Sequence, residues 1–543
     1  MGQRNRKSSE PPTGEAGFRI EALLTPAAFP HAVAQLELRE TFISWIILTG
    51  EFAYKIKKPV SFDFLDASTL ERRRALCDEE LRLNRRLAAD LYLDVVAVTR
   101  EPGGLRIGGS GPVVEHAVRM RQFAPTDELA HQLAHANLPA ADFLAFGMRL
   151  AQFHRAAAVA AADSPYGGYD EVLNQVLGNL AALIGTLSGD KDLKLLARLT
   201  DWTNAATAAL EPLIRLRKAS GAVRECHGDL HARNIVRWRG ELTPFDCLEF
   251  EPALRWIDVA SDVAFLFMDL VAHKRMDLAY AFLNGYLEEG GDYEGLRLLP
   301  FYAIYRALVR AKVDALSART ASTEVAAGLH ARLADRLTVA ARFLKPAEPA
   351  LIIMHGVTAC GKSRVSGDLT LTLGAVRVRS DLERKRLAGV APLNHRSFDV
   401  RAGAYDEACT NRTYARLLEC ADAALASGSH VIVDATFLDS RQRELFHSLA
   451  TERRCPFLII ACSAPREVLD ARLVERAATG SDPSEATIAV LDDQLRSQHA
   501  LSAHELAHTI NIRTDIPGSI GSGLDAIRAH LERAAPCSLA MSA

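Results

Sequence analysis

The 543-residue sequence lacks the features that would direct it to a membrane or an oxidising compartment. No apolar run approaches the roughly 18 residues needed to cross a bilayer. The first seventeen residues are polar and lack the apolar core of a signal peptide. Nine scattered cysteines without a CxxC pair argue against a disulfide framework or a zinc site. We therefore expect a cytoplasmic protein with no membrane partner and a disordered N-terminus over residues 1–17.

Strong net charge is also missing, since the formal charge is only −3. The whole chain therefore has no electrostatic footprint for nucleic acid. The hydrophobic fraction of 49% and the charged fraction of 24% are ordinary, and at this length they allow more than one core. Two prolines in KPAEPA, residues 345–350, interrupt a helix-rich region. We expect one domain over 18–345 and another over 350–543.

The two parts differ in their periodicity. In the first part, residues 41–58 and 93–123 alternate as in an antiparallel sheet, whereas 70–91 and most of 140–343 have helical periodicity. This pattern predicts a two-lobed α+β domain with a loop region near 224–250. In the second part, apolar strands at 351–355, 375–379, 430–434, 457–463 and 509–512 alternate with helical segments. This pattern predicts an α/β domain with a parallel sheet and helices on both faces.

The most informative segment is LIIMHGVTACGKS, residues 351–363, in which an apolar strand leads into a phosphate-binding loop. The backbone N–H groups of such a loop surround phosphates, its lysine reaches the terminal phosphates, and its serine hydroxyl binds Mg²⁺. The spacing therefore predicts an ATP site formed by Gly356, Val357, Thr358, Ala359, Cys360, Gly361, Lys362 and Ser363.

Three further segments point to a P-loop kinase rather than a motor ATPase. Asp381 and Arg384, in SDLERKR, follow a strand, and this Asp-x-x-Arg resembles the polynucleotide kinase and zeta-toxin-like group. That resemblance implies that Asp381 is the general base for an acceptor hydroxyl. Asp434, in VIVDATF, resembles a second nucleotide motif near the metal or the substrate. Arg472 and Arg476 lie four residues apart on one helical face, as in the lid of small P-loop kinases, and would stabilise the transferring phosphoryl group.

The N-terminal part contains a second, unrelated phosphotransfer signature, CHGDLHARN, followed by PFDCLEF. Phosphoryl transfer of the kinase type needs an aspartate for the acceptor hydroxyl, and an asparagine and a second aspartate for the metal. Asp229, Asn234 and Asp246 have the spacing for these roles. The set resembles the aminoglycoside phosphotransferase and choline kinase group. His227 is expected to hold the loop, whereas His231 is either structural or near the acceptor.

This resemblance implies a strand lysine that contacts the nucleotide phosphates and a helical glutamate that pairs with it. Lys55 in FAYKIKK is the candidate, with Lys57 as the alternative on the same strand face. Glu80 is preferred over Glu79 as the partner. No GxGxxG loop precedes Lys55, which leaves the cover of the nucleotide undefined and allows a degenerate domain that binds without transferring phosphate.

The whole chain resembles bacterial proteins in which an aminoglycoside phosphotransferase-like domain is fused to a P-loop ATP-binding domain. The resemblance implies an ATP- and Mg²⁺-dependent phosphotransferase with two sites, the first acting on a small-molecule hydroxyl and the second on another hydroxyl acceptor. Nucleic acid enters this prediction only as a 5′-hydroxyl substrate of the second domain. The alternative is an ATPase or nucleotide-binding regulator, and a third possibility is an aminoglycoside resistance enzyme. The sequence leaves both acceptors and the oligomeric state open.

Overall fold

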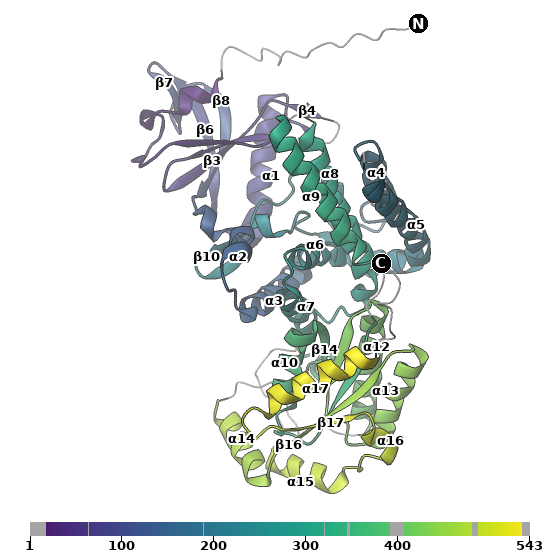
Figure 1. The fold of residues 1–543 in the computed structure, drawn as a ribbon. Coiled ribbons are helices and arrows are strands. Elements are labelled where there is room, and N and C mark those ends of the chain that lie inside the picture. The colour runs from purple at the N-terminus through teal and green to yellow at the C-terminus, as the bar shows by residue number, and fades with distance from the viewer. Residues whose placement is uncertain are drawn as a thin grey trace. The chain divides into compact units, whose positions relative to one another are not determined.

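The computed structural model describes residues 18–62, 65–187, 189–319, 321–344, 348–390, 407–479 and 487–534 (Figure 1). The predicted disordered segment 1–17 lies outside these residues. The chain forms two compact units. The first comprises the described residues up to His131, with His227–Asp229 and Arg233–Arg255, and the second comprises the remainder. Within the described residues, no helix is both long and apolar enough to span a membrane.

The first unit is built on a six-stranded antiparallel sheet in the order β1-β2-β3-β8-β6-β7. Its strands are β1 (Glu37–Glu40), β2 (Ser44–Leu48), β3 (Phe52–Lys57), β6 (Tyr92–Glu101), β7 (Gly104–Ile107) and β8 (Val113–Arg121). Smaller elements complete it: η2 (Ile20–Leu23), η3 (Pro26–Ala28), β4 (Ser61–Phe62), β5 (Leu65–Asp66), η4 (Pro125–Asp127), β10 (Ile235–Trp238), β11 (Glu241–Pro244) and η6 (Pro252–Leu254). The predicted antiparallel lobe is confirmed.

Both faces of β3 are buried. Tyr54 and Ile56 pack into a core with η2, η3 and β6, whereas Ala53 packs on the opposite face with α1 (Leu70–Ala88). Alternation places Lys55 on the same face as Ala53. The helix begins at Thr69, whose hydroxyl accepts a hydrogen bond from the backbone of Arg72 at 3.3 Å.

The second unit contains a helical region and a parallel sheet. The helices of the region are α3 (Ala140–Ala156), α4 (Tyr169–Ile184), α5 (Asp190–Ala219), α6 (Val259–Ala272), α7 (Met276–Gly290), α8 (Leu299–Ala318) and α9 (Thr323–Ala341). Helix α6 is buried along almost its whole length. Helices α3 and α7 approach closely at two glycines, because a Cβ on Gly147 or Gly285 would lie about 2 Å from a carbonyl oxygen of the other helix. Three short elements also belong to this unit: β9 (Val223–Glu225), β12 (Trp256–Asp258) and η7 (Glu294–Leu298). Two others, α2 (Leu129–His135) and η5 (Ala232–Asn234), contain residues of both units.

The sheet has five parallel strands, as predicted, and their order is β14-β15-β13-β16-β17. They are β13 (Leu351–His355), β14 (Ala375–Arg379), β15 (His430–Asp434), β16 (Phe457–Ser463) and β17 (Thr509–Arg513). The helices that accompany them are α10 (Lys362–Leu373), α11 (Ser380–Leu387), α12 (Glu407–Ala426), α13 (Ser440–Glu452), α14 (Arg466–Thr479), α15 (Ile488–Ser497), α16 (Ala503–Leu506) and α17 (Ser519–Ala534).

The helical region and the sheet belong to one compact unit, with contacts from α7 to β14 and α10 and from η7 to α12. The domain boundary at 345–350 thus stays a prediction from the sequence. In the structure, residues on both sides of it pack together in one unit. Each parallel strand is followed by a helix, as the green and yellow part of Figure 1 shows. Because the strands are parallel, their carboxyl ends lie at the same end of the sheet. In open α/β sheets, ligands bind at the carboxyl ends of the strands.

Candidate functional site

The first unit brings Lys55, Glu80 and Asp246 into direct contact. The Nζ atom of Lys55 lies 2.8 Å from the Oε1 atom of Glu80 and 2.5 Å from the Oδ1 atom of Asp246. The side chain of Glu80 is fully buried, whereas that of Asp246 is 43% exposed. The structure therefore pairs the two residues chosen from the sequence, Lys55 and Glu80, and adds the aspartate that was predicted to hold metal.

Lys57 does not replace Lys55 but binds the same glutamate. Its Nζ atom lies 2.5 Å from the Oε2 atom of Glu80, and it also donates a hydrogen bond to Glu249. Sequence reasoning missed Glu249, although it stands only three residues after Asp246 in FDCLEF. The alternation of β3 places both lysines on one face. Two buried ammonium groups need more than one carboxylate partner, and this need could have pointed to Glu249.

The electrostatics of this group follow from burial and from the pairing. Burial alone would raise the pKa of Glu80, but the charges of Lys55 and Lys57 lower it to about 2. Burial alone would lower the pKa of Lys55, yet Asp246 and Glu80 raise it well above its ordinary value. Burial raises the pKa of Glu249 despite its contact with Lys57. The shifts in pKa of Lys55, Lys57 and Glu80 thereby favour the charged forms of these three residues.

The catalytic loop predicted from CHGDLHARN is held by its own side chains. The Nδ2 atom of Asn234 donates to the carboxylate of Asp229 at 2.8 Å and to its backbone oxygen at 3.0 Å. The ring of His227 bridges the backbone oxygen of Phe245, 3.0 Å from Nε2, and the backbone N–H of Asp229, 3.3 Å from Nδ1. His227 therefore holds the loop. Since the amide nitrogen of Asn234 is engaged with Asp229, its amide oxygen is the atom suited to a metal.

Asp246 has an unusual backbone, with φ of 63°. A non-glycine residue adopts this left-handed conformation rarely and at a cost. Hydrogen bonds fix the segment, because its backbone N–H donates to the hydroxyl of Tyr92 at 3.1 Å and the N–H of Cys247 donates to the side chain of Asn84 at 2.9 Å. The strained conformation directs the Asp246 carboxylate toward Lys55.

His231, which the sequence left undecided, belongs to the second unit and is buried there. Its Nε2 atom lies 2.8 Å from Arg310, and its ring packs against Phe265. These contacts favour the structural role over the acceptor role.

The second candidate site is a cavity of about 710 Å³ at the carboxyl ends of the parallel strands. Small-molecule sites range from about 300 to 1,000 Å³. Ten predicted residues line the cavity, and seven of them are expected to act on the phosphates, the metal or the acceptor: Lys362, Ser363, Asp381, Arg384, Asp434, Arg472 and Arg476. Thr358, Ala359 and Gly361 also line it.

The loop has the geometry of a phosphate cradle. Gly356 has φ of 137°, and a Cβ there would lie 2.4 Å from the carbonyl oxygen of Cys462. Gly361, with φ of 90°, precedes the first residue of α10. The Nζ atom of Lys362 folds back onto the carbonyl oxygens of Gly356 and Val357 at 2.9 and 2.8 Å. Gly356, Val357 and the fully buried Cys360 thus shape the loop without lining the cavity.

Asp434 is suited to a metal because the hydroxyl of Ser366 donates to its Oδ2 atom at 3.0 Å and orients the carboxylate. With the hydroxyl of Ser363 it supplies oxygen ligands, which Mg²⁺ prefers. Asp381 and Arg384 lie one helical turn apart, 3.6 Å between Oδ1 and Nη1. The residues therefore fit the predicted magnesium nucleotide and an acceptor beside it.

Arg472 does more than line the cavity. Its guanidinium donates to the backbone oxygen of Ala359 at 3.1 Å and to Thr514 at 2.9 and 3.0 Å. Thr514 in turn donates to the backbone oxygen of Cys360 at 2.8 Å. Arg472 therefore ties the phosphate loop to the end of β17. The predicted lid loop after Arg476 lies largely outside the described residues, because 480–486 are not among them.

Sequence reasoning missed several polar residues of the cavity, among them Arg364, Thr436, Asp439, Gln442 and Gln494. Gln494 accepts a hydrogen bond from the backbone N–H of Thr358 at 2.7 Å. Single polar residues outside a motif have no spacing signal, so only the fold brings them to the cavity.

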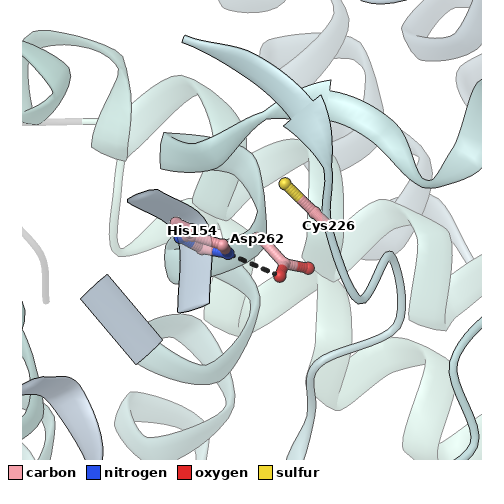
Figure 2. Close-up of side chains that lie close together, drawn as sticks. All are labelled: His154, Cys226 and Asp262. Atoms are coloured by element: carbon pink, nitrogen blue, oxygen red, sulfur yellow. Dashed lines mark hydrogen bonds and ion pairs between the residues drawn. The ribbon is translucent and has the colours of Figure 1, made fainter. Parts of the chain in front are cut away.

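A separate buried group, His154, Cys226 and Asp262, is the one set of three potential metal ligands found within 4.8 Å in the described part of the chain (Figure 2). The two ring nitrogens of His154 contact the carboxylate of Asp262 at 3.1 Å and the hydroxyl of Tyr286 at 3.0 Å. The thiol of Cys226 donates to the backbone of Ile257 at 3.5 Å. These hydrogen bonds already satisfy the ring and the thiol, so the cluster is best explained as part of the core.

Known proteins resemble both parts of the chain. A family model described as an AAA domain matches residues 351–501. The uncharacterized protein Rv2004c of Mycobacterium tuberculosis is 33% identical over 461 residues, a match that covers 84% of this chain and 89% of that protein. The uncharacterized protein Mb2027c of Mycobacterium bovis matches equally well.

Two solved structures cover different parts of the chain. A choline/ethanolamine kinase family protein from Mesorhizobium loti is 15% identical and covers 60% of this chain and 97% of its own, with a TM-score of 0.37. A gluconokinase from Sinorhizobium meliloti is 18% identical and covers 35% of this chain and 99% of its own, with a TM-score of 0.25. The AAA match and the geometry of the loop confirm the predicted P-loop domain.

Proposed function

The chain belongs to the family of these mycobacterial proteins, and from that premise we propose an ATP- and Mg²⁺-dependent phosphotransferase with two nucleotide sites. The first site phosphorylates a hydroxyl of a small molecule, and the second phosphorylates another hydroxyl acceptor. The observation that carries the proposal is the convergence of a phosphate loop, an Asp-x-x-Arg helix and two arginines of α14 on one cavity.

In the second site, the loop N–H groups and Lys362 hold the nucleotide phosphates, and Ser363 and Asp434 hold the magnesium ion. Lys362 moves from the carbonyls of Gly356 and Val357 to the phosphates when nucleotide binds. Asp381 accepts the proton of the acceptor hydroxyl. Arg476 stabilises the negative charge of the transferring phosphoryl group.

In the first site, Lys55 contacts the phosphates, and Glu80 keeps it in place. Asn234 and Asp246 hold the metal, and Asp229 orients and deprotonates the acceptor hydroxyl. The support for these roles is the contact of Lys55 with both Glu80 and Asp246, and the hydrogen bond from Asn234 to Asp229. The carboxylate of Asp246 and the amide oxygen of Asn234 are ligands that suit Mg²⁺.

The test is ATP consumption by the full-length protein with a panel of acceptors comprising sugar acids, polyols, amino alcohols and a 5′-hydroxyl oligonucleotide. We expect Asp381→Asn and Asp229→Asn to abolish stimulation by two different acceptors. Loss of a general base costs about 10²- to 10⁴-fold in rate. Lys362→Ala should abolish only the stimulation that depends on Asp381.

The alternative function is an ATPase or regulator in which one site hydrolyses or senses ATP and controls the other. It predicts acceptor-independent hydrolysis that survives Asp381→Asn but not Lys362→Ala. Such a result, without stimulation by any member of the panel, would refute the kinase proposal for the second site.

A further inference from the structure

We propose that Asn284 and Glu288 of α7 are positioning residues for the P-loop site, so that the helical region of the kinase-like part supports catalysis in the P-loop part. The inference rests on the proposed function of that site. The two residues lie one helical turn apart and are 2% and 1% exposed. Both contact β14, the strand that leads directly into the helix carrying Asp381 and Arg384.

The side chain of Asn284 makes the hydrogen bonds with β14 that a neighbouring strand would otherwise make. β14 is an edge strand of the sheet, so its outer N–H and C=O groups need partners. The side-chain amide of Asn284 donates to the oxygen of Ala375 at 2.8 Å and accepts from the N–H of Arg377 at 2.6 Å. This pair is the one that a parallel strand would make with residues i and i+2. The hydroxyl of Tyr293 donates to the next outward oxygen, that of Arg377, at 3.2 Å.

Glu288 fixes the side chains at the end of the same strand. Its Oε1 atom accepts from the guanidinium of Arg377 at 2.6 and 2.8 Å, and its Oε2 atom lies 3.7 Å from Arg379. Arg377 also donates to the backbone oxygen of Ser363 at 3.4 Å, and Arg379 is the N-cap residue of α11. One buried carboxylate is thereby linked both to the phosphate loop and to the start of the acceptor helix.

The far end of α11 is held from the same side. Arg386 donates to the backbone oxygen of Glu288 at 2.8 Å and pairs with the buried Glu383. Arg416 links Glu383 to the backbone oxygen of Gly291, immediately after α7. One side of α11 is therefore anchored to α7, and the residues that line the cavity, Asp381 and Arg384, lie on the same two-turn helix.

The chemistry explains why anchoring matters. A general base must lie within hydrogen-bond reach of the acceptor hydroxyl, and a displacement of about 1 Å can cost 10²-fold in rate. In the proposed site the nucleotide phosphates are held by the loop and Lys362, and Glu288 is linked to this segment through Arg377, which donates to the backbone oxygen of Ser363 at 3.4 Å. Loss of Glu288 should therefore lower turnover far more than nucleotide affinity.

The test compares Glu288→Gln, Glu288→Ala and the control Glu289→Gln in the full-length protein. Glu289 is the adjacent buried carboxylate on α7, but it pairs with Arg155 of α3, and no ion pair joins it to the described residues of the P-loop part. Turnover is measured with the acceptor panel, nucleotide affinity with a fluorescent ADP analogue, and amide exchange on the peptide covering residues 375–387.

We expect turnover to fall about 100-fold in Glu288→Ala and less in Glu288→Gln, which retains one acceptor oxygen. Affinity should change less than threefold, and exchange over 375–387 should accelerate in Glu288→Ala but not in Glu289→Gln. Equal effects of Glu288→Ala and Glu289→Gln, or parallel losses of affinity and turnover, would overturn the inference. If Lys362→Ala leaves turnover unchanged, the proposed function itself fails, and exchange over 375–387 still decides whether α7 anchors the strand.

Discussion

Replacement of Glu80 by Gln is the sharpest test of the first site. Glu80 is fully buried between two lysines, at 2.8 Å from Lys55 and 2.5 Å from Lys57. Its pKa falls from an ordinary 4.5 to about 2, because the two ammonium groups outweigh the effect of burial. A difference of about 2.5 pKa units corresponds to roughly 3 kcal/mol in favour of the charged form in the folded state.

The expected loss is somewhat smaller than this figure. After the substitution, Lys55 retains Asp246 and Lys57 retains Glu249, so neither ammonium group is left without a carboxylate. We expect the free energy of local opening of α1 and β3 to fall by about 2–3 kcal/mol at pH 7. This is less than the 3–5 kcal/mol typical when a buried charge loses its only partner.

The assay is native-state hydrogen exchange of the full-length protein, because it reports the opening of one segment even where global unfolding is not two-state. Glu79→Gln is the matched control. Glu79 is the neighbouring, partly exposed glutamate, which pairs with Arg82 and Arg255 outside the lysine cluster. Exchange in α1 and β3 should accelerate about 30- to 150-fold in Glu80→Gln and much less in Glu79→Gln.

The pH dependence supplies a second check with a definite sign. The folded-state pKa of Glu80 is depressed, so its contribution is fully present above the unfolded value of about 4.5 and is lost as the pH falls toward about 2. The difference between wild type and Glu80→Gln should therefore be constant from pH 5 to 7 and shrink below 4.5. Equal free energies of local opening in the wild type and Glu80→Gln at pH 7 would refute the reasoning.

Four other substitutions of single residues test the two sites. Gly356→Ala should abolish fluorescent nucleotide binding at the P-loop site, because φ is 137° and a Cβ would lie 2.4 Å from a backbone oxygen of β16. Arg472→Ala should weaken nucleotide binding by about tenfold, because it removes the tie between the loop and β17, whereas Arg476→Ala should lower kcat with little effect on affinity. Glu249→Gln should destabilise α1 and β3 less than Glu80→Gln at pH 7, since burial raises the pKa of Glu249 whereas the two lysines lower that of Glu80.

Local patterns predicted much of the fold. Four of the five parallel strands have the predicted bounds, and the fifth extends one residue further, because short apolar runs between helices leave few alternatives. The phosphate loop followed from the spacing of Gly356, Gly361 and Lys362. Glu80 was identified correctly as the residue that contacts Lys55, and its burial follows from the stripe Arg73, Cys77, Glu80 and Asn84 on one face of α1.

The sequence could not predict contacts that depend on packing between distant segments. Glu249 reaches Lys57 across 192 positions, and Asn284 reaches Arg377 across 93. Neither residue stands in a motif with its partner, and Asn284 reads simply as a polar residue within a helix. The roles of the predicted site residues remain proposals. The structure gathers most of the second set around one cavity, and in the first unit it joins Lys55 to Glu80 and Asp246, and Asn234 to Asp229.

The edge of the parallel sheet gives a physical reason for the fusion of the two parts. An uncovered β14 would expose the oxygens of Ala375 and Arg377 and the N–H of Arg377, the kind of edge that promotes pairing with other chains. Asn284 and Tyr293 satisfy these groups from the helical region. A fragment beginning near residue 348 would lose these partners and would leave Arg377 without the buried carboxylate of Glu288. Inactivity of that fragment would therefore show that β14 has lost its contacts with the helical region, not that the site itself is inactive. Single-site variants of the intact chain are the informative comparison.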